Sequence, residues 1–271
     1  MRKKFVFLWA IILILVLLTG CSDSEPSNLQ QEKLVEQIRY LDAKIVGMLN
    51  KLNNISFDNY AITTRQIGIN TNGNENEESE DFETILSTEM VPDTVLLSNH
   101  DYINWEILKQ EIELLNSAWA TIILNLYSME IDAEEILAFS RDLDIAIINI
   151  KGEDKRGSLT SLARLYSHLP KYLENIEEEV ITKHIKQTKA FVLNAYALVE
   201  QRNWAEVASN IVEADNAFRN ILSDIDYVRS NEFKVNRTYV LLKELERSIE
   251  FRDSEIFFMN YRNLMQALNT M

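Results

Sequence analysis

We expect an all-α protein, arranged as an antiparallel helical bundle or as a short solenoid of αα-hairpins. Glycine and proline are scarce, at six and three residues in a chain of 271, whereas a sheet-rich chain of this length would need more of both at its turns. Apolar residues instead recur at alternating spacings of four and three positions, which is the period of one helix face. This period favours a left-handed antiparallel bundle, and a solenoid of hairpins shares the same local packing.

The chain begins with the parts of a secretory signal. Arg2-Lys3-Lys4 precedes fourteen apolar residues, Phe5 to Leu18, and a basic start followed by such a run is typical of a signal peptide. As a helix the run would be about 21 Å long at about 1.5 Å per residue, too short to cross a bilayer core of about 30 Å comfortably. We therefore predict a signal peptide over residues 1–20 rather than a transmembrane anchor.

The signal ends at Leu18-Thr19-Gly20-Cys21, which resembles the lipobox of bacterial lipoproteins. The resemblance implies that a diacylglycerol is attached to the sulfur of Cys21 and that cleavage removes residues 1–20. It also implies that the protein is anchored at the extracytoplasmic face of the cell membrane. Two acyl chains hold a soluble domain on a bilayer, and residues 21–28 would form a short polar tether.

Cysteine count and charge exclude several classes of function. Cys21 is the only cysteine, so once acylated it leaves no thiol for a disulfide, a metal site or a nucleophile, and we expect no cofactor beyond the covalent lipid. The net charge is −15, and removal of residues 1–20, with three basic residues and no acid, leaves −18. Because this charge repels phosphates and anionic headgroups, we expect no nucleic-acid partner and no broad membrane contact beyond the anchor.

The first helix is expected over residues 29–55, where one apolar face keeps a 4-3-4-3 spacing. This face consists of Leu34, Ile38, Leu41, Ile45, Met48, Leu52 and Ile55. Residues 56–99 have no sustained period, and residues 75–83 hold six acids in nine positions. We expect an acidic, partly disordered loop over 56–99.

A body of helical hairpins, packing with the first helix, is expected over residues 100–271. Its first two apolar faces are Trp105, Leu108, Ile112, Leu115, Trp119, Ile122, Leu126 and Met129, and then Ile136, Phe139, Leu143, Ile147 and Ile150. Asp132 can cap the second of these helices. The next face is Leu159, Leu162, Tyr166, Leu169, Leu173 and Ile176. We expect Pro170 to kink or end this helix.

Four more faces follow in the same way. They are Ile181, Ile185, Thr188, Val192, Ala195 and Val199; then Trp204, Val207, Ile211, Ala214, Phe218, Ile221 and Ile225; then Val235, Thr238, Leu242, Leu245 and Ile249; and then Phe257, Tyr261, Leu264 and Leu268. Turns at Asp154, Asn203 and Asp253 lie 49 and 50 residues apart, which suggests an internal repeat of hairpins.

The whole body, with its tryptophan-rich second helix and the stretch Leu162-Ala163-Arg164-Leu165-Tyr166, resembles uncharacterised helical lipoproteins of spore-forming Gram-positive bacteria. This resemblance implies no particular activity.

Side chains with catalytic potential are few. His100, His168 and His184 belong neither to an HExxH motif nor to the Glu-x-x-His motif of di-iron bundles. Ser167 precedes His168 directly, and neighbours on a helix point apart, so the two should not form a dyad. We expect no enzyme activity and no metal site.

Two functions remain open. The first is a lipid-anchored extracytoplasmic interaction or scaffold module for an envelope protein. Its candidate contact residues are Glu77, Glu78, Glu80 and Asp81. The alternative is a small-ligand or cofactor-binding bundle, such as a sensor-type subunit, whose cavity could be lined by Asn194, Asp215 and Asn216. Lys183, Lys186 and Gln187, with Lys189 nearby, would form a basic stripe that accepts an acidic partner or balances Glu177–Glu179.

Overall fold

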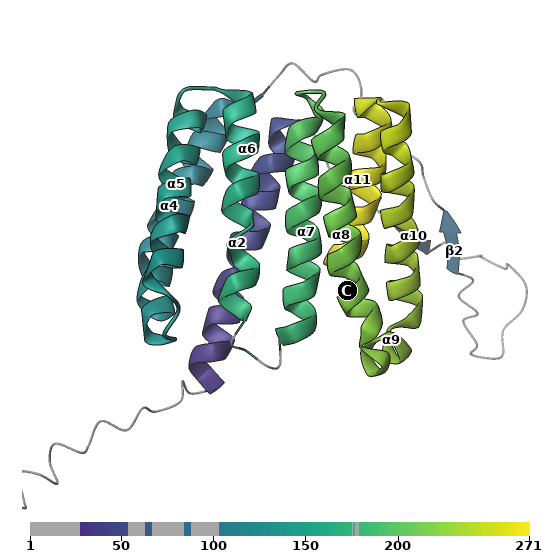
Figure 1. The fold of residues 1–271 in the computed structure, drawn as a ribbon, viewed down its shortest axis with the longest axis horizontal. Helices are drawn as coiled ribbons and strands as arrows, with labels where there is room; N and C mark the ends of the chain where they lie inside the picture. Colours follow the sequence, from purple (N-terminus) through teal and green to yellow (C-terminus); the bar gives the residue numbers. More distant parts are fainter. Residues whose placement is uncertain (1–27, 54–62, 67–83, 88–102, 175, 177–178) are drawn as a thin grey trace, which may run out of the picture.

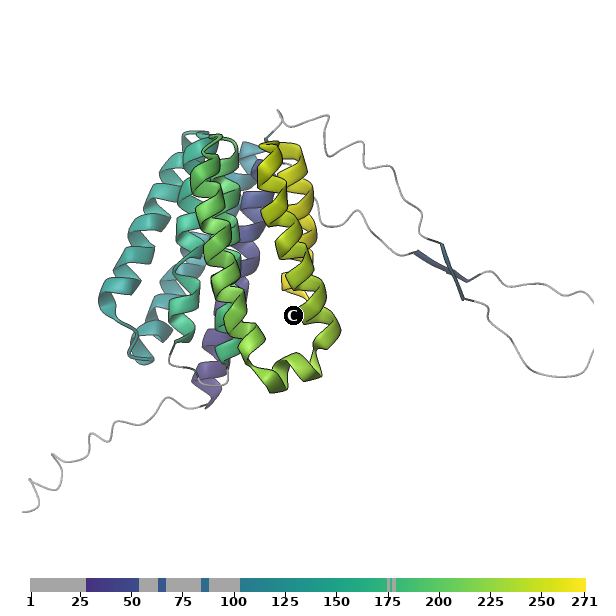
Figure 2. The same cartoon turned by 45° about the vertical axis from the view of Figure 1, so that its right-hand side comes forward.

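The computed structural model describes residues 28–53, 103–174, 176 and 179–271, together with the backbone of residues 63–66 and 84–87. Within these ranges the chain forms a row of antiparallel helices (Figures 1 and 2). The all-α prediction is confirmed.

The row contains α4 (Trp105–Ser128), α5 (Ala133–Lys151), α6 (Lys155–Tyr166), α7 (Val180–Val199), α8 (Trp204–Ser223), α9 (Ile225–Ser230), α10 (Glu232–Ser248) and α11 (Ser254–Asn269), with 3₁₀ turns η1 (Leu169–Leu173) and η3 (Ile249–Phe251). From α4 to α10 the row follows the order of the chain, and α11 turns back to pack against both α10 and α7 (Figure 1). The N-terminal helix α2 (Asn28–Leu52) leaves this order, because it packs against α4, α6 and η1. Its bounds lie close to the predicted 29–55.

One continuous apolar core extends from α2 to α11. The predicted faces of α2 and α4 are buried in it, apart from Trp105, which is partly buried, and Ile55, which lies outside the described residues. Trp119 stacks on Phe139 with 3.9 Å between ring centroids. Trp204 is also partly buried against the core. The tryptophan side chains of the described body therefore pack in or against the apolar core.

The end of α2 is also bonded to two distant helices. Asn53 donates to the hydroxyl of Tyr196 on α7 at 2.8 Å, and Tyr261 on α11 donates to Asn50 at 2.9 Å. Buried polar groups need such partners, because an unpaired one costs about 1–3 kcal/mol. These bonds join the end of α2 to α7 and to α11.

The three predicted hairpin turns share one backbone conformation. In each, a residue with left-handed φ stands before an Asp or Asn that caps the next helix. The pairs are Glu153 (φ 57°) with Asp154, Arg202 (φ 55°) with Asn203, and Arg252 (φ 51°) with Asp253. All three turns lie at the same end of the row (Figure 1). The 49- and 50-residue spacing thus corresponds to a turn conformation that recurs three times.

Two expectations need correction. The loop expected over 56–99 contains a two-stranded antiparallel ribbon, β1 (Thr63–Gln66) paired with β2 (Thr84–Ser87), and both segments include β-branched residues, which favour strands. The apolar face expected to run from Trp204 to Ile225 stops at Ile221. Asp224 has an extended backbone and caps a new helix, α9, so that Ile225 is exposed.

Pro170 ends its helix as predicted. The α-helix α6 stops at Tyr166, and the chain continues through the 3₁₀ turn η1, in which Pro170 occupies the first turn. Proline lacks the N–H that a longer α-helix would need at this point.

Candidate functional site

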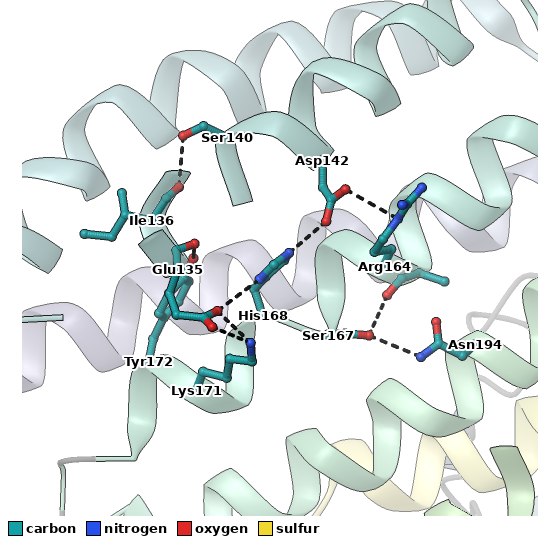
Figure 3. Close-up of polar contacts among 11 residues, drawn as sticks. Glu135, Ile136, Ser140, Asp142, Arg164, Ser167, His168, Lys171, Tyr172 and Asn194 are labelled. Carbon is teal, nitrogen blue, oxygen red and sulfur yellow. Dashed lines mark hydrogen bonds and ion pairs between the residues drawn. The ribbon is translucent and has the colours of Figure 1, made fainter. Parts of the chain in front are cut away.

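A network of charged side chains surrounds His168 where α6 ends (Figure 3). Nε2 of His168 lies 2.9 Å from Asp142, and Nδ1 lies 3.6 Å from Glu135, both on α5. Lys171 reaches Glu135 at 2.7 Å, and Arg164 reaches Asp142 at 3.4 Å. The hydrogen bond from Lys171 is the largest cause that holds the pKa of Glu135 below its ordinary value. The network therefore joins α5 to α6 and η1 through ion pairs, although Nδ1 of His168 has no hydrogen-bond partner among the described residues.

Ser167 faces away from this network, as the sequence predicts. Its hydroxyl donates to the carbonyl oxygen of Ala163 at 3.1 Å and accepts from Asn194 on α7 at 3.2 Å (Figure 3). Of the other histidines, His184 pairs with Gln187 at 2.9 Å, whereas His100 lies outside the described residues.

A groove of about 300 Å³ lies between α6, α7 and α8. Its polar lining consists of Thr160, Arg164, Ser167, Asn194 and Asn210, and its apolar lining of Ala163, Ala197 and Leu198. This arrangement can take a small polar molecule, and the guanidinium of Arg164, which also pairs with Asp142, lies on one side of the groove. Of the three residues expected to line a cavity, only Asn194 lines this groove.

The other two have different environments. Asp215 is buried and paired with Arg219 at 2.8 Å and with Lys243 at 2.7 Å. Burial alone would raise the pKa of Asp215, but hydrogen bonds from Lys243 and Arg219 outweigh it and lower the pKa. Asn216 is exposed on α8.

The predicted basic stripe on α7 is largely buried, which corrects the sequence interpretation. Lys186 and Lys189 are each only 4% exposed, and both pair with Asp42 on α2, at 2.7 and 3.2 Å. Burial lowers the pKa of Lys189. Asp42 is partly buried, and the loss of water around its carboxylate alone would raise its pKa, but the two ammonium groups outweigh this effect and hold the pKa below its ordinary value. Sequence reasoning missed this pair because Asp42 lies far away along the chain.

The outward face of α10 carries exposed apolar side chains on an edge helix of the row. Phe233 and Val240 are 77% and 58% exposed. With Glu232, Asn236, Arg237 and Leu241 they line a shallow groove of about 510 Å³. The signal was present in the sequence, because Phe233 and Val240 are seven positions apart and lie off the Val235–Leu242 face.

The predicted site residues Cys21, Glu77, Glu78, Glu80 and Asp81 lie outside the described residues. Among the residues that the structure places, no helix has the length and apolarity to cross a membrane. Within the same ranges, no three His, Cys, Asp or Glu side chains are grouped as ligands for a metal ion. In three comparisons, the chain matches no protein-family model, no curated protein and no solved structure.

Proposed function

We propose that this protein is a lipid-anchored, extracytoplasmic interaction module that presents its row of helices to another protein of the cell envelope. The observation that carries the proposal is the outward face of α10, where Phe233 and Val240 are exposed beside a groove. Large apolar side chains that stand together on a surface are typical of protein contacts. The acidic residues Glu77, Glu78, Glu80 and Asp81 are a second candidate contact.

The anchor rests on the lipobox. Cys21 lies seven positions before Asn28, where α2 begins. Fully extended, this stretch would reach about 25 Å at about 3.6 Å per position. The module would therefore stay close to the membrane.

Cys21→Ser tests the anchor. The variant lacks the sulfur that accepts the diacylglycerol, so we expect it to lose metabolic labelling with a fatty acid and to accumulate with residues 1–20 uncleaved. Gel mobility and N-terminal analysis of the membrane fraction measure both effects. A labelled and processed Cys21→Ser protein would overturn the anchor.

Cross-linking in the native membrane, followed by mass spectrometry, tests the interaction module. We expect a reproducible protein cross-linked to the wild-type chain and lost when Phe233 and Val240 are both changed to serine. Leu114→Ser with Leu124→Ser, at exposed positions on α4, is the matched control and should retain it. A variant with amides at Glu77, Glu78, Glu80 and Asp81 tests the acidic segment. Equal capture by all variants would exclude both contacts.

The ligand-binding alternative is supported by the groove between α6, α7 and α8, because Asn194 and Arg164 both line it. A thermal shift across a panel of small carboxylates and phosphates, abolished by Asn194→Leu, would support this function. If no compound shifts the wild-type protein, the interaction module is favoured.

A further inference from the structure

We propose that the outward face of α10 binds a second copy of this chain, in a parallel pair whose two lipid anchors lie in the same membrane. This inference rests on the proposed function, since it names the partner of the same face and uses the lipid anchor. The spacing of the exposed residues, the placement of two charges and the direction of α10 support it.

The exposed residues of α10 follow the spacing of a coiled-coil seam. Val235, Thr238 and Leu242 face the core. On the opposite side, Phe233, Asn236 and Val240 are exposed at intervals of three and four, which are successive a, d and a positions of a heptad. An asparagine within such a seam specifies register and the number of helices that associate.

Two charges next to the seam favour the parallel orientation. With Phe233 at position a, Glu232 is at the preceding g position and Arg237 at the following e position. In a parallel pair the g residue of one helix meets the e residue of the other five positions on. Glu232 of each copy would then meet Arg237 of the other, in two symmetric ion pairs. In an antiparallel pair like charges would meet instead.

Glu232 and Arg237 are available for this contact. Both are exposed, and neither forms an ion pair with any other residue that the structure describes. The seam is short, because the next a position is Arg247, which pairs with Glu244 on the same helix. The contact therefore covers the first half of α10.

The lipid anchor imposes the same direction on both copies. The start of α2, to which the tether is attached, lies at the same end of the row as α9 and the start of α10 (Figures 1 and 2). With a tether of at most about 25 Å, this end faces the membrane in each copy, and the two α10 helices run the same way. A seam of this size is smaller than a stable protein interface. Confinement to one membrane raises the effective concentration and compensates for this.

Cysteine cross-linking of the full-length, lipidated protein in its membrane tests the pair. Because Cys21 is acylated, Asn236→Cys introduces a single free thiol that meets its own counterpart across the parallel seam. We expect copper-catalysed oxidation to yield a disulfide-linked dimer. Thr121→Cys, at an exposed position on α4, is the matched control and should remain monomeric.

Charge reversal tests the register in the Asn236→Cys background. Arg237→Glu alone and Glu232→Arg alone should each lower the dimer yield about tenfold, because attraction is replaced by repulsion at two places. The double variant Glu232→Arg/Arg237→Glu exchanges the two charges and should restore the yield. All three substitutions are at exposed positions, so an unchanged thermal midpoint confirms that each variant folds.

Three results would overturn the pair. The first is that Asn236→Cys gives no dimer, and the second is that the double variant does not restore the dimer yield. The third is that Asn236→Cys forms disulfides preferentially with Arg141→Cys on α5, which would indicate that the rows stack edge to edge. Fatty-acid labelling of the same samples separates this inference from the anchor. Labelled protein without a dimer overturns only the pair, whereas a dimer formed by unlabelled protein overturns only the anchor.

Discussion

Asp42 on α2 is paired with two buried lysines, Lys186 and Lys189. It binds two ammonium groups on α7, so that this cluster holds two positive charges and one negative charge. Taking charges out of water costs several kcal/mol for each ion, and this cost is recovered only when the partners are well placed. The two lysines are therefore not equivalent to Asp42. Either lysine can be lost while Asp42 stays paired, whereas loss of Asp42 leaves both lysines buried without it.

This asymmetry leads to a prediction about stability. Asp42→Asn should lower the free energy of unfolding by about 3–5 kcal/mol, because two buried ammonium groups lose their counter-charge. Lys189→Met should change it by no more than about 1 kcal/mol, because Lys186 remains 2.7 Å from Asp42 and the buried charge excess is removed. Urea unfolding followed by circular dichroism measures both. A larger loss for Lys189→Met than for Asp42→Asn would contradict this account.

The hairpin turns are the elements that repeat most regularly. Each places a residue other than glycine at a φ of 51–57° before the cap, a conformation that costs an L-residue roughly 1–2 kcal/mol. The cap offsets part of this cost, since a side chain such as Asn203 accepts a hydrogen bond from the backbone of the helix it begins. Glycine adopts this backbone conformation without the steric cost.

We therefore expect Arg202→Gly to stabilise the protein. The gain should be about 0.5–1 kcal/mol, because relief of the left-handed conformation is partly offset by the greater freedom of the unfolded chain. The matched control is Arg141→Gly, the same substitution in the interior of α5, which should destabilise by about 1 kcal/mol. Thermal unfolding distinguishes the two signs. If both variants were destabilised equally, the turn would not be strained.

At the scale of the whole molecule, ion pairs link helices along most of the row. Lys51 on α2 pairs with Glu111 on α4, Lys171 on η1 with Glu135 on α5, and Lys243 on α10 with Asp215 on α8. The apolar core supplies the main driving force for packing. The ion pairs make the stability of the fold depend on pH.

Acidification should destabilise the fold. Asp42, Glu135 and Asp215 all have pKa values held below their ordinary values, which are about 3.9 for Asp and 4.3 for Glu in an unfolded chain. As the pH falls, the unfolded chain takes up these protons first, so the stability that the pairs contribute is complete above about pH 5 and is lost below about pH 4. The thermal midpoint, measured from pH 7 to pH 3, should be level at first and then fall.

Asp215→Asn provides the control for this pH dependence, because it removes one of the three carboxylates. Its midpoint should start lower at pH 7 and decline less steeply below pH 4 than that of the wild-type protein. A midpoint that rises on acidification would show that these carboxylates do not carry the dependence.

The sequence by itself determined the helices and most of their ends. The apolar period, the cap at Asp132, the turns at Asp154 and Asn203, and the break at Pro170 all act within a few residues, so local physics is enough to predict them. The end of α8 is the exception, since Ile225 continues the apolar spacing while Asp224 starts a new helix.

Only the tertiary structure decided which side chains meet and which faces stay open. Lys186 and Lys189 read as surface charges because lysine is rarely buried unless paired, and their partner Asp42 lies more than 140 positions earlier in the chain. Likewise Phe233 and Val240 could have packed against a further helix. They are exposed because α10 lies at the edge of the row, and a local periodicity carries no information about which helix forms the edge.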